Sequence, residues 1–316
     1  MIIPTYNRVH YLTKALESAL AQTYRNTEIL VSDNAADPEV ARVVASYRDP
    51  RVRYRHNGRT LGLTGNAVAA SREARGEYVS TLHDDDMWEP TLLEELVPPL
   101  EADRDLVLAF SDHWVMRSDD SVDPELTEAA TRRWGRQELR EGRHQPFYGL
   151  ALADRAIPIG ACVMRRSAID WQDFPEEIGT AYDYWIFYLA SRGGGGAHYC
   201  PRRLMRYRWH AGAESASRNQ QWRIYCYNRF IEDERLRPIR GELQRVAAVS
   251  STSHGIALLR DGRNGEGRAT LLKGMAHAPE LRGVFSLFLS LYPPAFRLAD
   301  RVWHTRLQRG RRRVTV

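Results

Sequence analysis

Short apolar runs alternate with amphipathic segments through the first 110 residues, and this alternation constrains the fold more than any other feature of the chain. Leu12, Ala15 and Leu16 recur at a spacing that is typical of one face of a helix. Alternating strands and helices predict a mostly parallel sheet with helices on both faces, so we expect an α/β fold. The expected strands are Ile2–Ile3, Glu28–Ser32, Val52–Arg55, Tyr78–Leu82 and Leu106–Phe110.

The regular alternation ends near Phe110, and the pattern then changes twice more. Residues 111–158 are polar with scattered aromatic side chains, and they precede a predicted helix at Thr180–Ser191 and a predicted strand at Leu204–Trp209. Beyond Gln220 the pattern is helical. We therefore expect three parts, at 1–110, 111–219 and 220–316.

Polar side chains follow several of the predicted strands. Thr5, Tyr6 and Asn7 come after the first strand, and Asp33 ends the second. The fourth strand runs into the acidic segment 84–86. Because ligands of open α/β sheets bind at the carboxyl ends of the strands, we expect a binding site at this edge.

The triplet Asp84-Asp85-Asp86 is the sharpest local signal in the chain. Three adjacent carboxylates repel one another, so a compensating partner is expected. A hard divalent cation such as Mg²⁺ or Mn²⁺ is one such partner, and it can bridge to substrate phosphates. The alternative is a solvated turn in which Asp86 caps a helix beginning at Pro90.

The ordered motifs of residues 2–100 resemble the N-terminal signature of family 2 glycosyltransferases. The resemblance starts with the sequence Ile-Ile-Pro-Thr-Tyr-Asn-Arg at positions 2–8 and continues through the acidic triplet to Trp88-Glu89-Pro90. It implies a GT-A fold and transfer of a sugar from a nucleotide diphosphate sugar. It also implies nucleotide-sugar binding in 1–110, and acceptor binding and catalysis in 111–219.

The resemblance further implies roles for individual residues of the donor site. Asp33 would accept a hydrogen bond from the base, Asp84 would contact the ribose or donor sugar, and Asp85 would coordinate the metal. One departure is visible, since the family often has an acidic residue where His83 stands. The other expected nucleotide-sugar-binding residues are Pro4, Thr5, Tyr6, Asn7, Arg59 and Asn66.

Two residues of the second half complete the expected site. By the same resemblance Asp183 would be the general base on the acceptor hydroxyl, which gives inversion at the anomeric carbon. Here Tyr182 replaces the usual Glu, and the alternative for Asp183 is a favourable charge at a helix N-terminus. His210 would close the metal site, unless it is structural. Arg206 and Arg208 are candidates for the diphosphate, or else for surface ion pairs.

The net charge of +5 is concentrated at the C-terminus. Residues 295–316 hold seven arginines and one aspartate, a net charge of +6, which leaves −1 for residues 1–294. This distribution argues against nucleic acid as a substrate. Two alternatives stay open for the basic tail, which are contact with an anionic membrane and a solvated end on a packed helix.

Cysteine usage and apolar runs bear on the compartment. Three scattered cysteines fit neither a disulfide framework nor a zinc site, so we expect a reducing compartment. The N-terminus shows no basic leader before an apolar run, and no run approaches the ~18–20 residues that span a bilayer. A cytoplasmic protein is expected, with peripheral contact at the inner face of the membrane if the tail binds lipid.

Together these patterns favour an inverting glycosyltransferase that uses Mn²⁺ or Mg²⁺ and a UDP-, dTDP- or GDP-sugar. The acceptor is not identified, and its classes include glycans, lipid-linked glycans and natural products. One alternative is a metal-dependent phosphohydrolase built on His83 and Asp84, and another is a non-catalytic module that binds an anionic surface.

Overall fold

A computed structural model of the chain describes residues 1–35, 37–209 and 220–292. The chain divides into two compact units, Met1–Ser217 and Arg218–Val316. His210 and the basic tail 295–316 lie outside the described residues. The boundary expected between residues 110 and 111 falls inside the first unit and stays a prediction.

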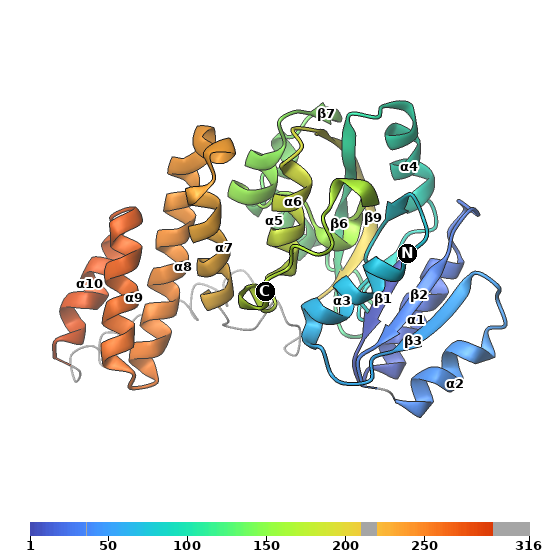
Figure 1. Ribbon diagram of the computed structural model, residues 1–316, viewed down its shortest axis with the longest axis horizontal. Helices are drawn as coiled ribbons and strands as arrows, with labels where there is room; N and C mark the ends of the chain where they lie inside the picture. The colour runs from blue at the N-terminus through green and yellow to red at the C-terminus, as the bar shows by residue number, and fades with distance from the viewer. Residues whose placement is uncertain (36, 210–219, 293–316) are drawn as a thin grey trace. The chain divides into compact units, whose positions relative to one another are not determined.

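The first unit begins with a three-stranded parallel sheet in the order β1-β2-β3 (Figure 1). The register pairs Thr5 with Asp33, and Asp33 with His56, so the carboxyl ends of the three strands lie side by side. These strands and the helices between them are β1 (Ile2–Thr5), α1 (Val9–Leu20), β2 (Ile29–Asp33), α2 (Pro38–Ser46), β3 (Val52–His56) and α3 (Gly62–Glu73).

A second sheet of six strands has the order β4-β8-β6-β9-β5, with β7 paired to β9. Among the described residues of this sheet, β6 and β9 pair in parallel and the other pairs are antiparallel. The expected α/β class is confirmed, but the parallel pairing is concentrated in the first sheet. The strands are β4 (Tyr78–Val79), β5 (Met87–Trp88), β6 (Leu106–Met116), β7 (Gly142–His144), β8 (Cys162–Arg165) and β9 (Gly196–Arg208). The helices are α4 (Leu92–Ala102), α5 (Pro124–Arg133) and α6 (Tyr182–Ser191).

Backbone hydrogen bonds join the two sheets at Ile2. Its amide donates to the Ser80 carbonyl over 2.9 Å, and its carbonyl accepts from the Leu82 amide over 3.0 Å. The acidic triplet that follows Leu82 is therefore carried to the same edge as the ends of β1 and β2.

The core of the first unit lies between the sheets and the apolar faces of α1 and α4. Leu12, Leu16, Leu92 and Leu96 are fully buried in one cluster with Val31. Burying side chains of this size is worth about 1.5–3 kcal/mol each, which fixes the two helices on the strands. Helix α4 begins at Leu92, after Thr91, rather than at the expected Pro90.

Strand β9 is longer than the sequence indicates, since it begins at Gly196 rather than at Leu204. Its pairing with β6 shifts where Ser111 opposes Cys200 and Asp112 opposes Arg203. Pro201 lies in this irregularity, where a missing N–H group breaks no regular ladder bond.

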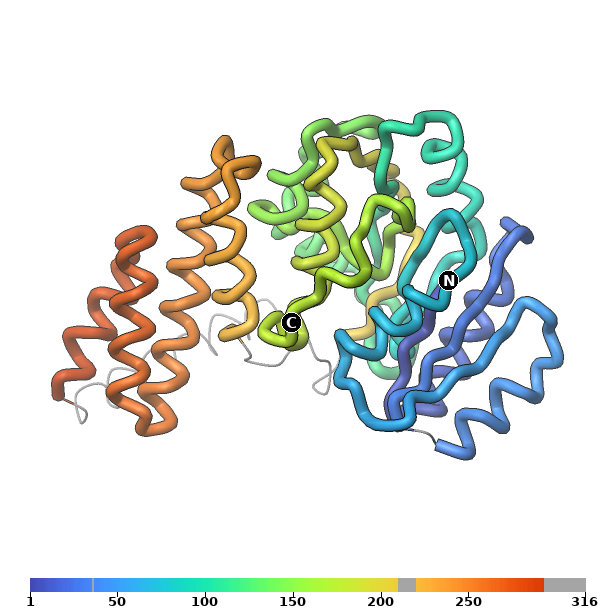
Figure 2. The backbone as a smooth tube through the Cα atoms, in the orientation of Figure 1, coloured from blue at the N-terminus to red at the C-terminus, as the bar shows by residue number. Residues whose placement is uncertain are grey.

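The second unit is helical in its described residues. Consecutive helices pack side by side (Figure 2). Helix α8 approaches α9 closely at Gly255, where a Cβ atom would lie 2.7 Å from Leu271 Cγ. Across the described residues, none of the helices combines the length and the apolar character that a membrane span requires. The helices are α7 (Gln220–Glu232), α8 (Arg240–Arg260), α9 (Asn264–His277) and α10 (Leu281–Ser290).

Candidate active site

The acidic turn between β4 and β5 lies against the end of β1. Asp84 Oδ2 accepts a hydrogen bond from Thr5 Oγ1 over 2.8 Å and from the Tyr6 amide over 3.4 Å. Arg8 Nη1 lies 3.3 Å from Asp84 Oδ1 and 2.9 Å from Asp85 Oδ2. Residues almost eighty positions apart in the sequence thus form one polar cluster at the carboxyl ends of the strands.

The charge of this turn is incompletely compensated. Asp84 is only 5% exposed. Burial and the neighbouring charge of Asp85 raise the pKa of Asp84 to about 6, although Arg8 and the Thr5 hydroxyl oppose the rise. A carboxylate of raised pKa at a ligand-binding edge indicates a place where further positive charge is favourable.

The donor atoms of the turn fit a hard cation. One oxygen of Asp84 and one of Asp85 point at the same guanidinium nitrogen of Arg8, so two carboxylates already share one cationic centre. Within the described ranges no group of three or more His, Cys, Asp or Glu side chains is arranged to hold a metal. A pair of carboxylates suits Mg²⁺ or Mn²⁺, which takes its remaining ligands from water and substrate phosphates.

Asp86 has a structural role instead of capping a helix. Its Oδ1 accepts the Arg208 amide over 2.8 Å, its Oδ2 lies 3.5 Å from His83 Nδ1, and the residue is 2% exposed. Burial raises the pKa of Asp86. The third carboxylate therefore fastens the end of β9 to the acidic turn.

His83 connects the acidic turn to helix α6. Its Nε2 lies 2.6 Å from the Tyr182 hydroxyl, at the first residue of that helix. Burial lowers the pKa of His83, but its interaction with Asp86 and the other two aspartates outweighs burial and holds the pKa above its usual value. The two positions at which the sequence departs from the family pattern are thus in contact with each other.

Asp183 follows Tyr182 in the first turn of α6 and is half-buried. Its charge contributes, after burial, to raising the pKa of Tyr182 well above the ordinary value. Since Tyr182 is bonded to His83, the hydrogen bond fixes the N-terminus of the helix that carries Asp183 to the acidic turn.

Asp33 is fully buried and organises the chain after β2. Its Oδ1 accepts the Ala35 amide and its Oδ2 accepts the Asp37 amide, each over 2.8 Å. The Tyr54 hydroxyl donates to Oδ2 over 2.9 Å, and burial together with Asp33 raises the pKa of Tyr54. Oδ2 thus accepts two hydrogen bonds, and Oδ1, which accepts one, can accept a further bond.

Asn66 is buried in α3 and braces the first sheet. Its Nδ2 donates to the Ser32 carbonyl over 2.9 Å, and its Oδ1 accepts from Ser32 Oγ over 2.6 Å and from Asn57 Nδ2 over 2.9 Å. Asn57 also donates to Asn34 Oδ1 over 3.0 Å. This asparagine cluster supports the binding edge from within.

The other expected donor-site residues differ in accessibility. Pro4 is buried in β1, whereas Tyr6 is 51% exposed and Arg59 is exposed in the loop after β3. Asn7 is exposed with φ at 55°, a left-handed conformation that asparagine adopts more readily than most residues. Tyr6, Asn7 and Arg59 are therefore the expected residues that a ligand can reach directly.

The two candidate arginines of β9 are engaged in the fold. Arg208 is 1% exposed, and its Nε donates to the Asp85 carbonyl over 2.7 Å while Nη1 donates to the Arg117 carbonyl over 3.1 Å. Arg206 Nε pairs with Glu89 Oε1 over 2.7 Å. The ion-pair alternative describes Arg206, and Arg208 is a buried support of the acidic turn.

The sequence indicates no role for Arg8, whose side chain contacts the carboxylates of both Asp84 and Asp85. Its only sequence signal is its place in the motif after Asn7. The pairing across 77 positions to Asp85 could not be read from local patterns.

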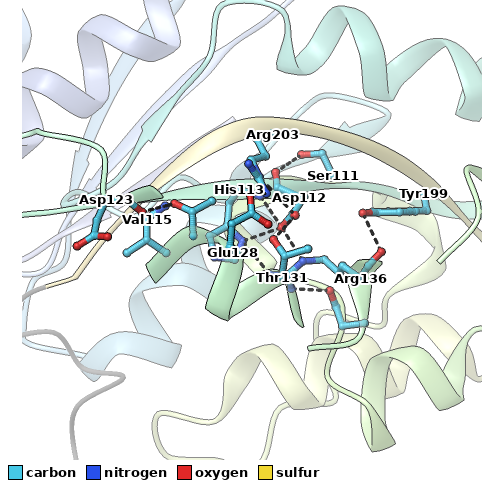
Figure 3. Close-up of polar contacts among 12 residues, drawn as sticks. Ser111, Asp112, His113, Val115, Asp123, Glu128, Thr131, Arg136, Tyr199 and Arg203 are labelled. Atoms are coloured by element: carbon cyan, nitrogen blue, oxygen red, sulfur yellow. Dashed lines mark hydrogen bonds and ion pairs between the residues drawn. The ribbon is translucent and has the colours of Figure 1, made fainter. Parts of the chain in front are cut away.

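The sequence also gives no sign of a buried ion pair between Asp112 of β6 and Arg136, which follows α5 (Figure 3). Arg136 Nε donates to Asp112 Oδ1 over 2.6 Å, and Thr131 Oγ1 donates to Asp112 Oδ2 over 2.6 Å. Burial raises the pKa of Asp112, but Arg136 and the Thr131 hydrogen bond outweigh it and hold the pKa below its usual value. Burial and the charge of Arg136 lower the pKa of His113 to about 4.

A cavity of about 550 Å³ lies elsewhere, near the amino ends of β1 and β4. Met1, Glu28, Arg53 and Arg75 line part of it, and the expected site residues do not. The candidate site therefore rests on the convergence of polar groups at the opposite ends of the strands.

The chain matches a known family of glycosyltransferases and several of its curated members. The Glycosyl transferase family 2 profile matches residues 1–171. An uncharacterized glycosyltransferase of Rickettsia conorii, RC0461, is 41% identical over 100 residues, which cover 31% of this chain and 16% of that protein. The Escherichia coli UDP-Glc:alpha-D-GlcNAc-diphosphoundecaprenol beta-1,3-glucosyltransferase WfaP is 27% identical over 115 residues, 36% of this chain and 45% of that protein. The matched segments thus span less than half the length of these curated relatives.

Solved structures share the fold at low sequence identity. Staphylococcus aureus TarS 1-349 in complex with UDP-GlcNAc superposes with a TM-score of 0.65 at 14% identity, covering 96% of this chain and 90% of that chain. The Pyrobaculum calidifontis mannosyltransferase PcManGT in complex with GDP-Man and Mn²⁺ gives 0.57 at 18% identity, covering 94% and 85%. The GT-A-like fold expected from the sequence is therefore confirmed.

Proposed function

The chain belongs to glycosyl transferase family 2, and from this premise we propose that it is an inverting, metal-dependent glycosyltransferase that uses a nucleotide diphosphate sugar. The observation that carries the proposal is the convergence of Thr5, Arg8, Asp84 and Asp85 at the carboxyl ends of the strands. A partly compensated pair of carboxylates beside an arginine suits a substrate that brings both a cation and a diphosphate.

The donor would bind along the edge formed by the ends of β1 and β2. Pro4 and Thr5 form the floor next to Asp84, and the exposed Tyr6, Asn7 and Arg59 are the groups that reach the nucleotide. Asp33 keeps capacity for one more hydrogen bond at Oδ1, which a base N–H can use. Asn66 acts indirectly, because it is buried and holds the strands in place.

The divalent cation would be held by Asp85, with Asp84 next to it and His210 as a further proposed ligand. When bound, Mn²⁺ or Mg²⁺ supplies positive charge for the departing diphosphate. Arg8 would then exchange its carboxylate partners for phosphate oxygens, because a guanidinium pairs with both.

Asp183 is the proposed general base. The acceptor oxygen forms a bond to the anomeric carbon while the bond from that carbon to the diphosphate oxygen breaks, and the acceptor proton passes to Asp183. The electron pair of the broken bond leaves with the nucleoside diphosphate. Tyr182 and His83 position the base, since their 2.6 Å contact fixes the start of α6.

The donor and acceptor are proposed as classes. UDP-, dTDP- and GDP-sugars are the donor candidates, and relatives of the fold are named with UDP-GlcNAc and GDP-Man. Glycans, lipid-linked glycans and natural products are the acceptor candidates, and the name of the relative WfaP, with its diphosphoundecaprenol acceptor, favours the lipid-linked class. A cytoplasmic location with peripheral contact at the inner face of the membrane fits such an acceptor.

The alternative functions have less support. A phosphohydrolase built on His83 needs a free ring nitrogen, but Nε2 contacts Tyr182 and Nδ1 faces Asp86. A non-catalytic surface-binding module gives no reason for the buried Asp84 beside the half-buried Asp85 at the binding edge.

A donor screen tests the proposal. Thermal unfolding of the full chain with Mn²⁺ and a panel of UDP-, dTDP- and GDP-sugars should show one nucleotide class that raises the midpoint, since a ligand that binds only the folded state stabilises it. Asp85→Asn should remove that shift, and Asp105→Asn, at an exposed aspartate before β6, should keep it. A panel without any shift or hydrolysis would refute the transferase assignment.

A further inference from the structure

Helix α10 packs with small residues inward and large apolar residues outward. Gly283, Ser286 and Ser290 are its buried residues, and a Cβ atom on Gly283 would lie 2.8 Å from Thr252 Oγ1. Leu287 and Leu289 are half-buried against the small cluster of Ile256, Leu259 and Leu271. The side of the helix that the second unit does not use is therefore the more apolar side.

The exposed residues form one continuous row, which we call the outer stripe. They recur three or four positions apart, which places them on one face of the helix and its last turn. Of the ten large hydrophobic residues exposed in the described part of the chain, six belong to it. The outer stripe consists of Leu281 (91% exposed), Val284 (48%), Phe285 (48%), Phe288 (72%), Leu291 (66%) and Tyr292 (67%).

A row of this kind calls for a partner, since scattered exposed side chains are common but contiguous patches are not. Val249 and Leu272, at 53% and 55% exposure, lie in α8 and α9 of the same unit and do not belong to the outer stripe. The positive charge of the residues that follow the outer stripe indicates an anionic partner. The 24 residues after Tyr292 contain seven arginines and one aspartate.

We propose that the outer stripe of α10 inserts into the surface of an anionic lipid bilayer. A second copy of the chain fits less well, because it would bring two segments of net charge +6 together. An anionic lipid surface instead attracts basic segments of this kind. Helix α10 has ten residues, which is too short to cross the membrane, so it would lie in the plane of the interface. Aromatic and leucine side chains next to arginines are typical of helices that bind in this way.

The inference goes beyond the proposed function, because it concerns where the enzyme works and is measured without activity. The full chain is incubated with vesicles of phosphatidylcholine alone or of phosphatidylcholine mixed with phosphatidylglycerol, and the bound fraction is measured by co-sedimentation. We expect binding to the anionic vesicles, weaker binding to the neutral ones, and loss of binding as salt rises.

Three variants of the full chain separate the contributions. The double change Phe285→Ser and Phe288→Ser should weaken binding at least about tenfold, because it removes apolar area that would enter the bilayer. The control, Val249→Ser with Leu272→Ser, removes two exposed apolar residues of the same unit that lie outside the outer stripe, and it should bind like the wild type. Changing Arg311, Arg312 and Arg313 to Gln should weaken binding to anionic vesicles only.

Each contrary outcome would overturn the proposal. Absence of wild-type binding to anionic vesicles would do so, and so would equal losses in the stripe variant and the control. A stripe variant that binds like the wild type would leave the arginines as the sole contact. If that variant instead lowers the mass in analytical ultracentrifugation with lipid binding intact, the occupant is a second copy. Circular dichroism of each variant checks that α10 and its neighbours stay folded.

Discussion

Asp84 and Asp112 are both buried in the first unit, but their surroundings shift the pKa values of the two carboxylates in opposite directions. Asp84 lies beside another aspartate and one half-buried arginine, and burial raises its pKa to about 6. Asp112 is paired with the fully buried Arg136 and bonded to Thr131, and its pKa is lowered. A buried carboxylate whose charge the fold compensates has a structural role, whereas one that the fold leaves short of positive charge indicates a site for a ligand.

The largest effect should come from the proposed base at the ligand edge. Asp183→Asn removes the proton acceptor, so transfer should fall by about 10²–10⁴-fold. Donor affinity and the free energy of unfolding should stay near the wild-type values, because the change is isosteric. Rapid-quench assays and donor titrations measure the two quantities, and retained transfer would refute the role of Asp183.

Loss of the buried ion pair between Arg136 and Asp112 should lower the free energy of unfolding and leave turnover unchanged. Arg136→Leu removes the nearest charged partner of Asp112 and leaves the more distant Arg203 at 3.8 Å, so it should cost about 3–5 kcal/mol of unfolding free energy in denaturant titrations. The control Arg143→Leu breaks an exposed pair with Asp103 and should cost less than about 1 kcal/mol. Similar losses in the two variants would remove the contrast between satisfied and unsatisfied carboxylates.

The two regions should also give opposite pH dependence of stability, measured with EDTA present. The pKa of Asp84 rises from 3.8 to about 6 on folding, so its contribution to stability is greatest below pH 4 and falls as pH rises toward 6. The pKa of His113 falls from 6.5 to about 4, so its contribution is lost as pH falls through that range. Each contribution is about 1–3 kcal/mol.

Substitution separates these opposing slopes. Asp84→Asn should make stability rise more steeply between pH 4 and pH 6 than in the wild type, because the falling contribution is gone. His113→Gln should have the reverse effect. Parallel stability curves for the wild type and both variants would show that neither group titrates differently in the folded state.

The smallest effect should come from the hydrogen bond between His83 of the acidic turn and Tyr182 of α6. Tyr182→Phe removes the hydroxyl bonded to His83 and should lower kcat about tenfold, a cost of about 1.4 kcal/mol, with donor KM unchanged. Tyr47→Phe, at a hydroxyl that bonds the distant Glu17, should leave both constants unchanged. A rise in donor KM without a change in kcat would contradict the positioning role.

Local patterns were sufficient for much of the fold. The strand ending at Asp33 and the acidic turn after β4 follow from apolar runs and the polar residues that end them. The sequence places the start of β9 too late because the glycines at 193–196 are typical of a break, whereas pairing with β6 begins the strand at Gly196.

Long-range pairing was the part that the sequence could not supply. The pairing of Arg8 with Asp85 and that of Arg136 with Asp112 depend on which strand ends meet in space. Arg208 was considered for the diphosphate because arginine suits phosphate, yet its burial turns it into a support for the acidic turn. Residue type suggests a chemistry, and burial decides whether a ligand can reach it.

Binding of Mn²⁺ to the acidic turn tests the central claim most directly. The full chain is titrated with Mn²⁺ in the presence of UDP, dTDP or GDP, and free Mn²⁺ is followed by electron paramagnetic resonance. We predict one bound ion per chain with at least one nucleotide, strengthened by that nucleotide and lost in Asp85→Asn but not in Asp105→Asn. Equal binding by the wild type and Asp85→Asn would contradict the account.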